Sequence, residues 1–203
     1  MRRPTADARP IGPANRPEIT ATGGFWAALG LFWFLDGWGL LPPFLLAAAL
    51  HELAHFAALR LLDVPVRAVE LRASGAVIRA ELKDEPWEIP AYLAGPGMNL
   101  RLFLLCSRLW PLFSLCNLGL AVWNGIPAPG LDGGRICAVA LPCLFGAFGV
   151  ILCKLIYTGT LALILLLGFW ATFELRLGLF PALTAGFFLL RLPKGLDKPR
   201  GGW

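Results

Sequence analysis

The two histidines of this chain, His51 and His55, stand four residues apart in the sequence HELAH, which also holds Glu52. Residues four positions apart on a helix lie on nearly the same face, so both imidazoles could bind one metal ion such as zinc. Glu52 is rotated off that ligand axis, where its carboxylate could act on a water bound to the ion. The spacing therefore predicts metal-assisted hydrolysis, with two ligands and a water-activating acid on one helix.

The motif lies near the middle of an apolar run, Leu40–Leu62, which is about as long as a helix that crosses a bilayer. Ionisable side chains are costly in hydrocarbon, so those found in a membrane helix usually have a function. A buried helix whose two histidines are only hydrogen-bonded is the alternative interpretation of this segment.

A catalytic zinc site usually takes three protein ligands and keeps a fourth position for water, so the two histidines need a partner. Few acidic residues lie in or near apolar segments, and the candidates are Asp36, Asp132 and Glu174. Asp132 is favoured because its segment, PAPGLDGG (127–134), holds prolines and glycines that should break a helix. Irregular backbone at membrane depth survives where it is buried in protein or lines a watery cavity. An ordinary surface loop explains the segment equally well.

The composition is that of an integral membrane protein. Hydrophobic residues make up 57% of the chain and charged residues only 15%, whereas soluble domains have about 25% charged residues. The five cysteines are scattered through apolar stretches without a CxxC pair, which indicates small buried side chains rather than disulfides or a metal cluster. We predict one all-α polytopic membrane domain over residues 23–192, between a flexible basic tail (1–22) and a short basic tail (193–203).

About six transmembrane helices fit this domain. The expected spans, with one shorter interfacial helix at Ile136–Phe145, are Gly23–Leu41, Leu40–Leu62, Glu88–Ser107, Leu109–Asn124, Phe148–Phe173 and Leu177–Leu192. With the N-terminus in the cytoplasm, this arrangement places all but three of the 18 Lys and Arg residues on cytoplasmic segments. We therefore expect a multi-pass membrane protein with both termini cytoplasmic. The basic residues flank the apolar runs and form no nucleic-acid-binding face.

Residues 63–87 are the one substantial polar excursion between the expected spans. Two β-prone arms surround Ala73-Ser74-Gly75, a sequence typical of a hairpin turn, and the second arm alternates apolar and charged residues. We predict a small membrane-associated β-hairpin between the second and third helices. It could be a mere connector, or its free edge could hold an extended peptide by strand addition.

Three motifs together resemble the site-2 protease family of intramembrane zinc metalloproteases. They are HELAH (51–55), AGPGMNL (94–100) and NGIPAPGLDGG (124–134), and they occur in the family's order. The resemblance covers the chain from about residue 40 to residue 135. Within the family the chain is most similar to the compact branch typified by stage IV sporulation protein FB, which releases a sigma factor from its membrane-associated precursor.

The resemblance implies one zinc ion per chain, bound by His51, His55 and Asp132. It also implies that Glu52 is the general base of a metalloendopeptidase. Asn124 is expected near the site, where it would hold the substrate or its carbonyl.

The implied substrate is a membrane-associated protein cut in or near its transmembrane segment, in a bacterial cell membrane; pro-sigma factor processing in sporulation is one instance. A helical peptide bond is shielded, so the substrate must be extended, and we expect the 63–87 hairpin to hold it by strand addition. The small residues Ala94, Gly95 and Gly97 should let the third helix approach the HELAH helix and bring Asn99 near the metal and substrate. A plain helix-packing notch explains these small residues equally well. A regulatory membrane partner also fits the resemblance.

Two other functions remain open. A membrane zinc transporter would also place histidine and aspartate at mid-membrane, but transporters usually show internal repeats, and the sequence shows none. A metal-free scaffold descended from a protease is the second alternative, against which the intact HELAH and LDGG motifs argue.

Overall fold

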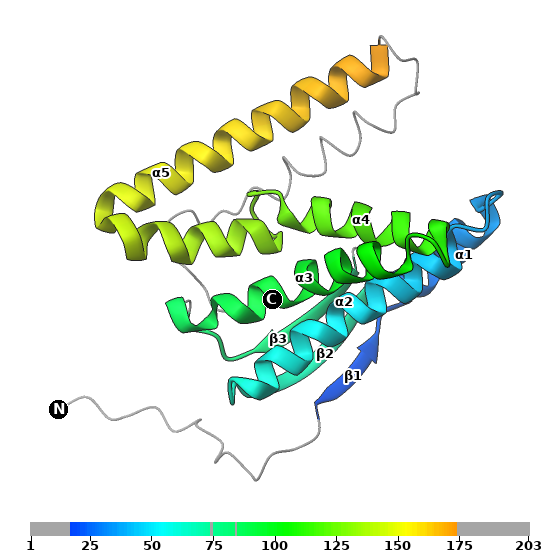
Figure 1. Ribbon diagram of the computed structural model, residues 1–203, viewed down its shortest axis with the longest axis horizontal. Helices are drawn as coiled ribbons and strands as arrows, with labels where there is room; N and C mark the ends of the chain where they lie inside the picture. Colours follow the sequence, from blue (N-terminus) through cyan, green and yellow to red (C-terminus); the bar gives the residue numbers. More distant parts are fainter. Residues whose placement is uncertain (1–16, 74, 84, 174–203) are drawn as a thin grey trace.

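The computed structural model describes residues 17–73, 75–83 and 85–173, which form five α-helices and a three-stranded sheet (Figure 1). In chain order the elements are β1 (Glu18–Ala21), α1 (Gly23–Leu35), α2 (Leu41–Leu61), β2 (Val66–Arg72), β3 (Gly75–Ala80), the 3-10 turn η1 (Pro86–Glu88), α3 (Ile89–Cys106), α4 (Pro111–Gly125) and α5 (Asp132–Phe173). Helices α2, α3 and α4 pack against one another, the sheet lies along α2, and α5 lies beyond α3 and α4.

Three predicted helices have nearly the expected bounds. Helix α2 begins with prolines in its first turn, where the missing N–H groups cost nothing. Helix α3 continues through Pro96, and α4 ends at Gly125, two residues before Pro127. Local sequence signals therefore set the ends of the helices that flank the HELAH motif.

Helix α1 is shorter than predicted, because the chain turns at Asp36 rather than continuing to Leu41. The Asp36 carboxylate accepts hydrogen bonds from the backbone N–H groups of Leu40 and Leu41, both at 2.8 Å. These bonds satisfy donors at the start of α2. Asp36 is thus a turn residue and not a candidate metal ligand.

Helix α5 joins the expected interfacial helix and the following span into one element with a sharp bend. The backbone of Gly146 is non-helical there (φ 57°, ψ −134°), and Figure 1 shows the two halves of α5 folding back on each other. The Tyr157 hydroxyl in the second half donates a hydrogen bond to the Gly134 carbonyl in the first. The last expected span, Leu177–Leu192, and the tail 193–203 lie outside the described residues.

Two of the described helices are long and apolar enough to cross a membrane, Leu41–Leu61 and Asp132–Trp170. Helix α1 is apolar but shorter, with 13 residues. The total of six spans therefore stays a prediction.

The predicted hairpin is present, but it belongs to a larger sheet. Strands β2 and β3 pair antiparallel, and β1 pairs with β2 in parallel. The prediction of a flexible tail over 1–22 was therefore wrong for Glu18–Ala21, because the second edge of β2 offers a backbone partner to this segment. Composition alone gave no sign of that long-range pairing.

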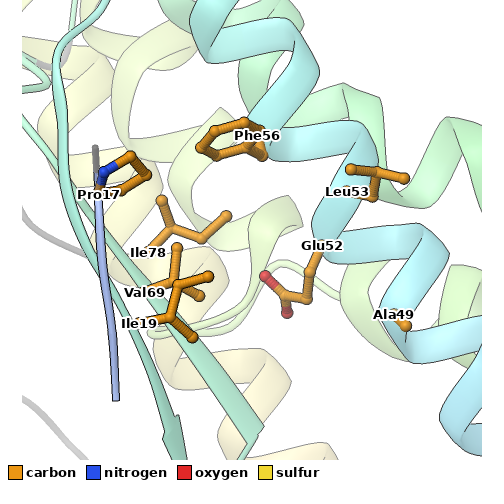
Figure 2. A pocket seen from close by; sticks show the side chains of 8 residues that line it. All are labelled: Pro17, Ile19, Ala49, Glu52, Leu53, Phe56, Val69 and Ile78. Carbon is orange, nitrogen blue, oxygen red and sulfur yellow. The ribbon is translucent and has the colours of Figure 1, made fainter.

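The two faces of the sheet differ in chemistry. Register aligns Ile19, Val69 and Ile78 in one row across the three strands, facing α2 (Figure 2). On the opposite face, Glu70 pairs with Arg72 and Arg79, and these guanidinium groups lower the pKa of Glu70. Of this row, Ile78 belongs to the buried core together with Leu59 and Tyr92, Val69 packs against that core, and Ile19 at the edge is exposed.

The junction between the sheet and α3 is fixed by Glu88. Its side chain is fully buried and accepts backbone hydrogen bonds from Lys83 at 2.9 Å and Glu85 at 3.1 Å. A buried carboxylate with several N–H donors is a strong anchor. It holds the end of the hairpin against the first turn of α3.

Candidate metal centre

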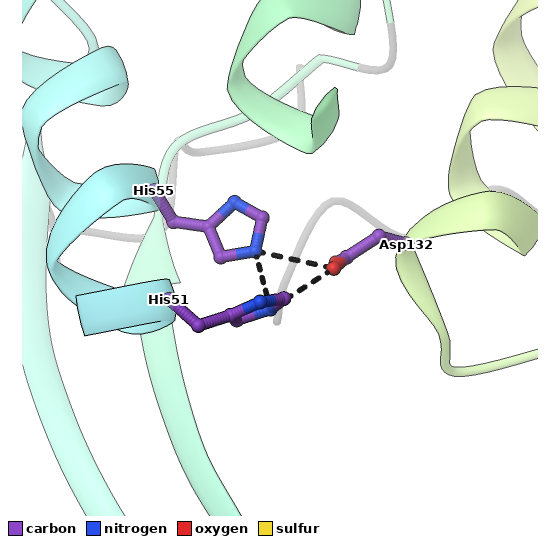
Figure 3. Close-up of side chains that lie close together, drawn as sticks. All are labelled: His51, His55 and Asp132. Atoms are coloured by element: carbon purple, nitrogen blue, oxygen red, sulfur yellow. Dashed lines mark hydrogen bonds and ion pairs between the residues drawn. The ribbon is translucent and has the colours of Figure 1, made fainter. Parts of the chain in front are cut away.

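Helix α2 presents both histidines inward from the middle of its length. His51 is 5% exposed and His55 is 1% exposed, and both side chains point away from the sheet toward the start of α5 (Figure 3). The helical spacing of HELAH therefore places the two rings as predicted. Neither ring is merely a packing residue, because each meets a buried carboxylate.

That carboxylate belongs to Asp132, the first residue of α5, which is 4% exposed. The segment before it is non-helical and turns at Gly130, whose φ of 87° suits glycine. The sequence suggested that Gly133 and Gly134 break a helix. Instead, both lie in the first turn of α5. A Cβ on Gly134 would lie 2.0 Å from the Ala128 carbonyl oxygen. The LDGG segment is thus packed tightly against protein, and the surface-loop interpretation was wrong.

The three side chains meet at one point. Asp132 Oδ2 lies 3.2 Å from the Nε2 atoms of both His51 and His55, and the two Nε2 atoms are 3.0 Å apart. Tetrahedral ligands at zinc distances of about 2.0–2.2 Å would be about 3.3 Å from one another. The donor set and its spacing therefore fit a zinc ion with two imidazoles and one carboxylate. Glu174, the remaining acidic candidate, lies outside the described residues.

The far side of each ring is already engaged, which leaves the Nε2 atoms for a metal. His55 Nδ1 lies 2.7 Å from the Ala91 carbonyl oxygen, and His51 Nδ1 contacts Asn99 Oδ1. Both partners are hydrogen-bond acceptors, so each ring donates its N–H from Nδ1 and keeps an electron pair on Nε2. Metal-binding histidines are commonly oriented in this way.

Asn99 is a fully buried residue of α3 and belongs to a longer polar chain. Its Nδ2 donates to the Ala47 carbonyl at 3.2 Å and to Asn117 Oδ1 at 2.7 Å. Asn117 in turn donates to the Phe113 carbonyl at 2.8 Å. Asn99 therefore lies next to a histidine ring, and its bonds fit an orienting role. Sequence analysis missed Asn117, because an asparagine in an apolar helix without a recognised motif gives no specific signal.

The AGPG segment of α3 contributes space rather than a functional group. A Cβ on Gly95 would lie 2.2 Å from His55 Nε2 and 2.6 Å from His51 Nε2. Only glycine therefore allows α3 to cross this close to both rings. The packing-notch interpretation is correct, and the notch lies directly on the histidine pair.

Glu52 lies on the neighbouring face of α2 and is partly exposed. Figure 2 shows its carboxylate pointing toward the sheet, into a pocket that it lines. Asn124 lies at the end of α4, where its Nδ2 donates to the Leu120 carbonyl of the same helix at 3.1 Å. The contacts of Asn124 thus give no support to its predicted role.

Comparison with known proteins adds a fold relationship. No protein-family model matches the sequence, and no curated protein does. The structure is similar to that of the site-2 protease from Methanocaldococcus jannaschii, with a TM-score of 0.62 and 21% sequence identity over 87% of this chain and 90% of that one. Because the similarity covers nearly all of both chains, this protein has the fold of that archaeal site-2 protease.

Proposed function

We propose that this chain is an intramembrane zinc metalloprotease that hydrolyses a peptide bond in or near the transmembrane segment of a protein substrate. The observation that carries the proposal is the meeting of His51, His55 and Asp132 at one buried point, next to Glu52 on the same helix. The site-2 protease fold and the HELAH motif support the same activity.

The residues of the site have different roles in the proposed hydrolysis. A bound zinc ion would supply Lewis-acid activation of a water and of the scissile carbonyl. The Glu52 carboxylate takes the proton of the attacking water and passes it to the leaving amine. Asn99 keeps the His51 ring in place through Nδ1, and the Ala91 carbonyl does the same for His55.

A membrane location fits the outer surface of the helices. Large apolar side chains such as Phe34 on α1, Leu105 on α3 and Leu155 on α5 are more than half exposed, and extended apolar surface is suited to lipid. The charge bias of the sequence supports a multi-pass arrangement with both termini cytoplasmic. Reporter fusions check this topology: one at residue 83 should report the cytoplasm and one at residue 108 the opposite side, and the reverse result contradicts it.

The substrate is held extended by the sheet. Pairing with β1 and β3 uses both edges of β2, so a substrate strand has the outer edge of β3 or of β1 as its partner. Processing of a pro-sigma factor in sporulation, under control of a regulatory membrane partner, is one biological setting that this activity would suit.

Substitution of the general base tests the proposed function. Purified protein with Glu52→Gln should bind about one zinc per chain, as the wild type does, and should have lost peptide cleavage by a factor of about 10² or more. Glu81→Gln, an exposed glutamate of the same chain, is the matched control and should cut normally. Undiminished cleavage by Glu52→Gln would remove this residue from its role, and zinc uptake into proteoliposomes would favour a transporter.

A further inference from the structure

A pocket of about 300 Å³ lies between α2 and the sheet, with the Glu52 carboxylate in its wall (Figure 2). The row Ile19, Val69 and Ile78 forms the wall on the side of the sheet. Ala49 and Phe56, each within one helical turn of Glu52, contribute to the wall on the side of α2. Among the lining residues Glu52 alone is ionisable, so the pocket is an apolar hollow with a single carboxylate.

The position of Glu52 determines which part of a substrate would lie next to this hollow. A general base must come within hydrogen-bond reach of the water that attacks the scissile carbonyl. The substrate side chain that flanks the scissile bond therefore has to lie beside the Glu52 carboxylate. The hollow is the space next to that carboxylate. Its volume is at the lower limit for ligand sites, which run from about 300 Å³ upward, so it suits one side chain rather than a large molecule.

We propose that this pocket is a substrate subsite that takes one large apolar side chain, branched aliphatic or aromatic, next to the scissile bond. The proposal rests on the proposed protease function and adds a specificity to it. Burying an apolar side chain against Val69, Ile78 and Phe56 is favourable by about 25 cal/mol per Å². An acidic side chain would meet the Glu52 carboxylate and be repelled, and a basic one would pair with the base that the reaction needs.

Ala49 lines the pocket with a small side chain, which leaves the hollow open. It is exposed and lies three residues before Glu52, on nearly the same face of α2. Ala49→Leu adds a branched side chain inside the hollow and leaves the buried core untouched. Ala57→Leu makes the same change at an exposed position of α2 that does not line the pocket. The two variants differ only in whether the new side chain fills the hollow.

Cleavage of a peptide library tests the proposal. Zinc-loaded wild type, Ala49→Leu and Ala57→Leu are incubated with peptides from a digested proteome, and the cut positions are read by mass spectrometry. Wild type and Ala57→Leu should prefer a large apolar residue at one position beside the cut. Ala49→Leu should shift that position toward glycine and alanine by about tenfold or more. A preference that Ala49→Leu leaves unchanged overturns the subsite.

A binding measurement keeps the test decisive if no library peptide is cut. Two short hydroxamates, which bind zinc directly, differ in carrying an isobutyl group or no side chain. The isobutyl compound should bind zinc-loaded wild type about tenfold tighter, and this difference should vanish in Ala49→Leu but persist in Ala57→Leu. Equal binding of both compounds to wild type would contradict the proposed subsite but not the metal centre. Failure of wild type to bind either compound contradicts the metal centre, and with it the proposed function.

Discussion

The histidine rings are held from behind by groups that no metal-binding motif contains. Asn117 on α4 contacts Asn99 on α3, which contacts His51 on α2, so three helices share one buried polar chain. Each amide is nearly or completely buried, where an unmade hydrogen bond would cost about 1–3 kcal/mol. Satisfied networks of this kind fix one arrangement of a core. The hydrogen-bonded series Asn117–Asn99–His51 thus links the packing of α4 to the orientation of a metal ligand.

Removing the Asn117 side chain, which is the member of this hydrogen-bonded series farthest from the metal ligands, should weaken metal binding without abolishing it. In Asn117→Ala, Asn99 loses the acceptor that holds its Nδ2, and zinc affinity should fall by about 10- to 100-fold. Titration against a competing chelator measures the change. Ser114→Ala is the control, because Ser114 is also buried on α4 but donates to the Phe103 carbonyl. Equal affinities of the two variants would contradict an orienting role for Asn117.

Gly95 allows a sharper comparison between neighbouring positions of α3. A Cβ in Gly95→Ala would overlap both histidine rings, so the rings must move and zinc binding should be lost. Gly97→Ala adds the same atom where nothing lies within 4 Å, and it should bind zinc like the wild type. Metal content after purification distinguishes the two. Normal zinc content in Gly95→Ala would show that α3 does not lie against the ligands.

At the scale of the elements, the bend in α5 brings its second half back onto the first turn, which carries Asp132. Gly146 at the bend has a backbone conformation that other residues rarely adopt. The Tyr157 bond to the Gly134 carbonyl then joins the second half to the turn that follows Asp132. The bend therefore allows Tyr157, which is distant in sequence, to stabilise the helical turn that carries the third ligand, Asp132.

Substitutions at two glycines of α5 should have opposite effects on stability. Gly146→Ala forces a strained backbone and should lower the free energy of unfolding by about 1–3 kcal/mol. Gly159→Ala lies in regular helix with open space around it and should raise the free energy by about 0.5–1 kcal/mol. Unfolding in detergent, followed by circular dichroism, measures both. Equal effects at the two positions would mean that the bend at Gly146 is not formed.

How far the elements could be predicted depended on the range of the interactions that form them. Helices α2, α3 and α4 carry their own signals in apolar runs and prolines, and the hairpin carries its turn. The pairing of β1 with β2 joins residues about 50 positions apart, and no local pattern encodes it. Among the site residues, the motif spacing led to His51, His55 and Asp132, whereas Asn117 and the Ala91 carbonyl act through three-dimensional proximity alone.

At the scale of the whole molecule, a polar centre lies within helices whose outer surfaces are largely apolar. The ligands come from the middle of α2 and the start of α5, so the centre exists only when distant parts of the chain are packed together. The sheet covers α2 on the side of Glu52, beside the pocket. The metal ligands and the pocket thus lie on adjacent faces of one helix.

The most direct test of this account is the X-ray absorption spectrum of zinc in the purified protein. The donor set predicts nitrogen and oxygen ligands at about 2.0–2.2 Å, two of them imidazoles, and no sulfur. Asp132→Asn should weaken the binding and alter the spectrum. A zinc–sulfur distance of about 2.3 Å would assign the metal to the free cysteines instead, and a protein that binds no zinc would contradict the metal centre altogether.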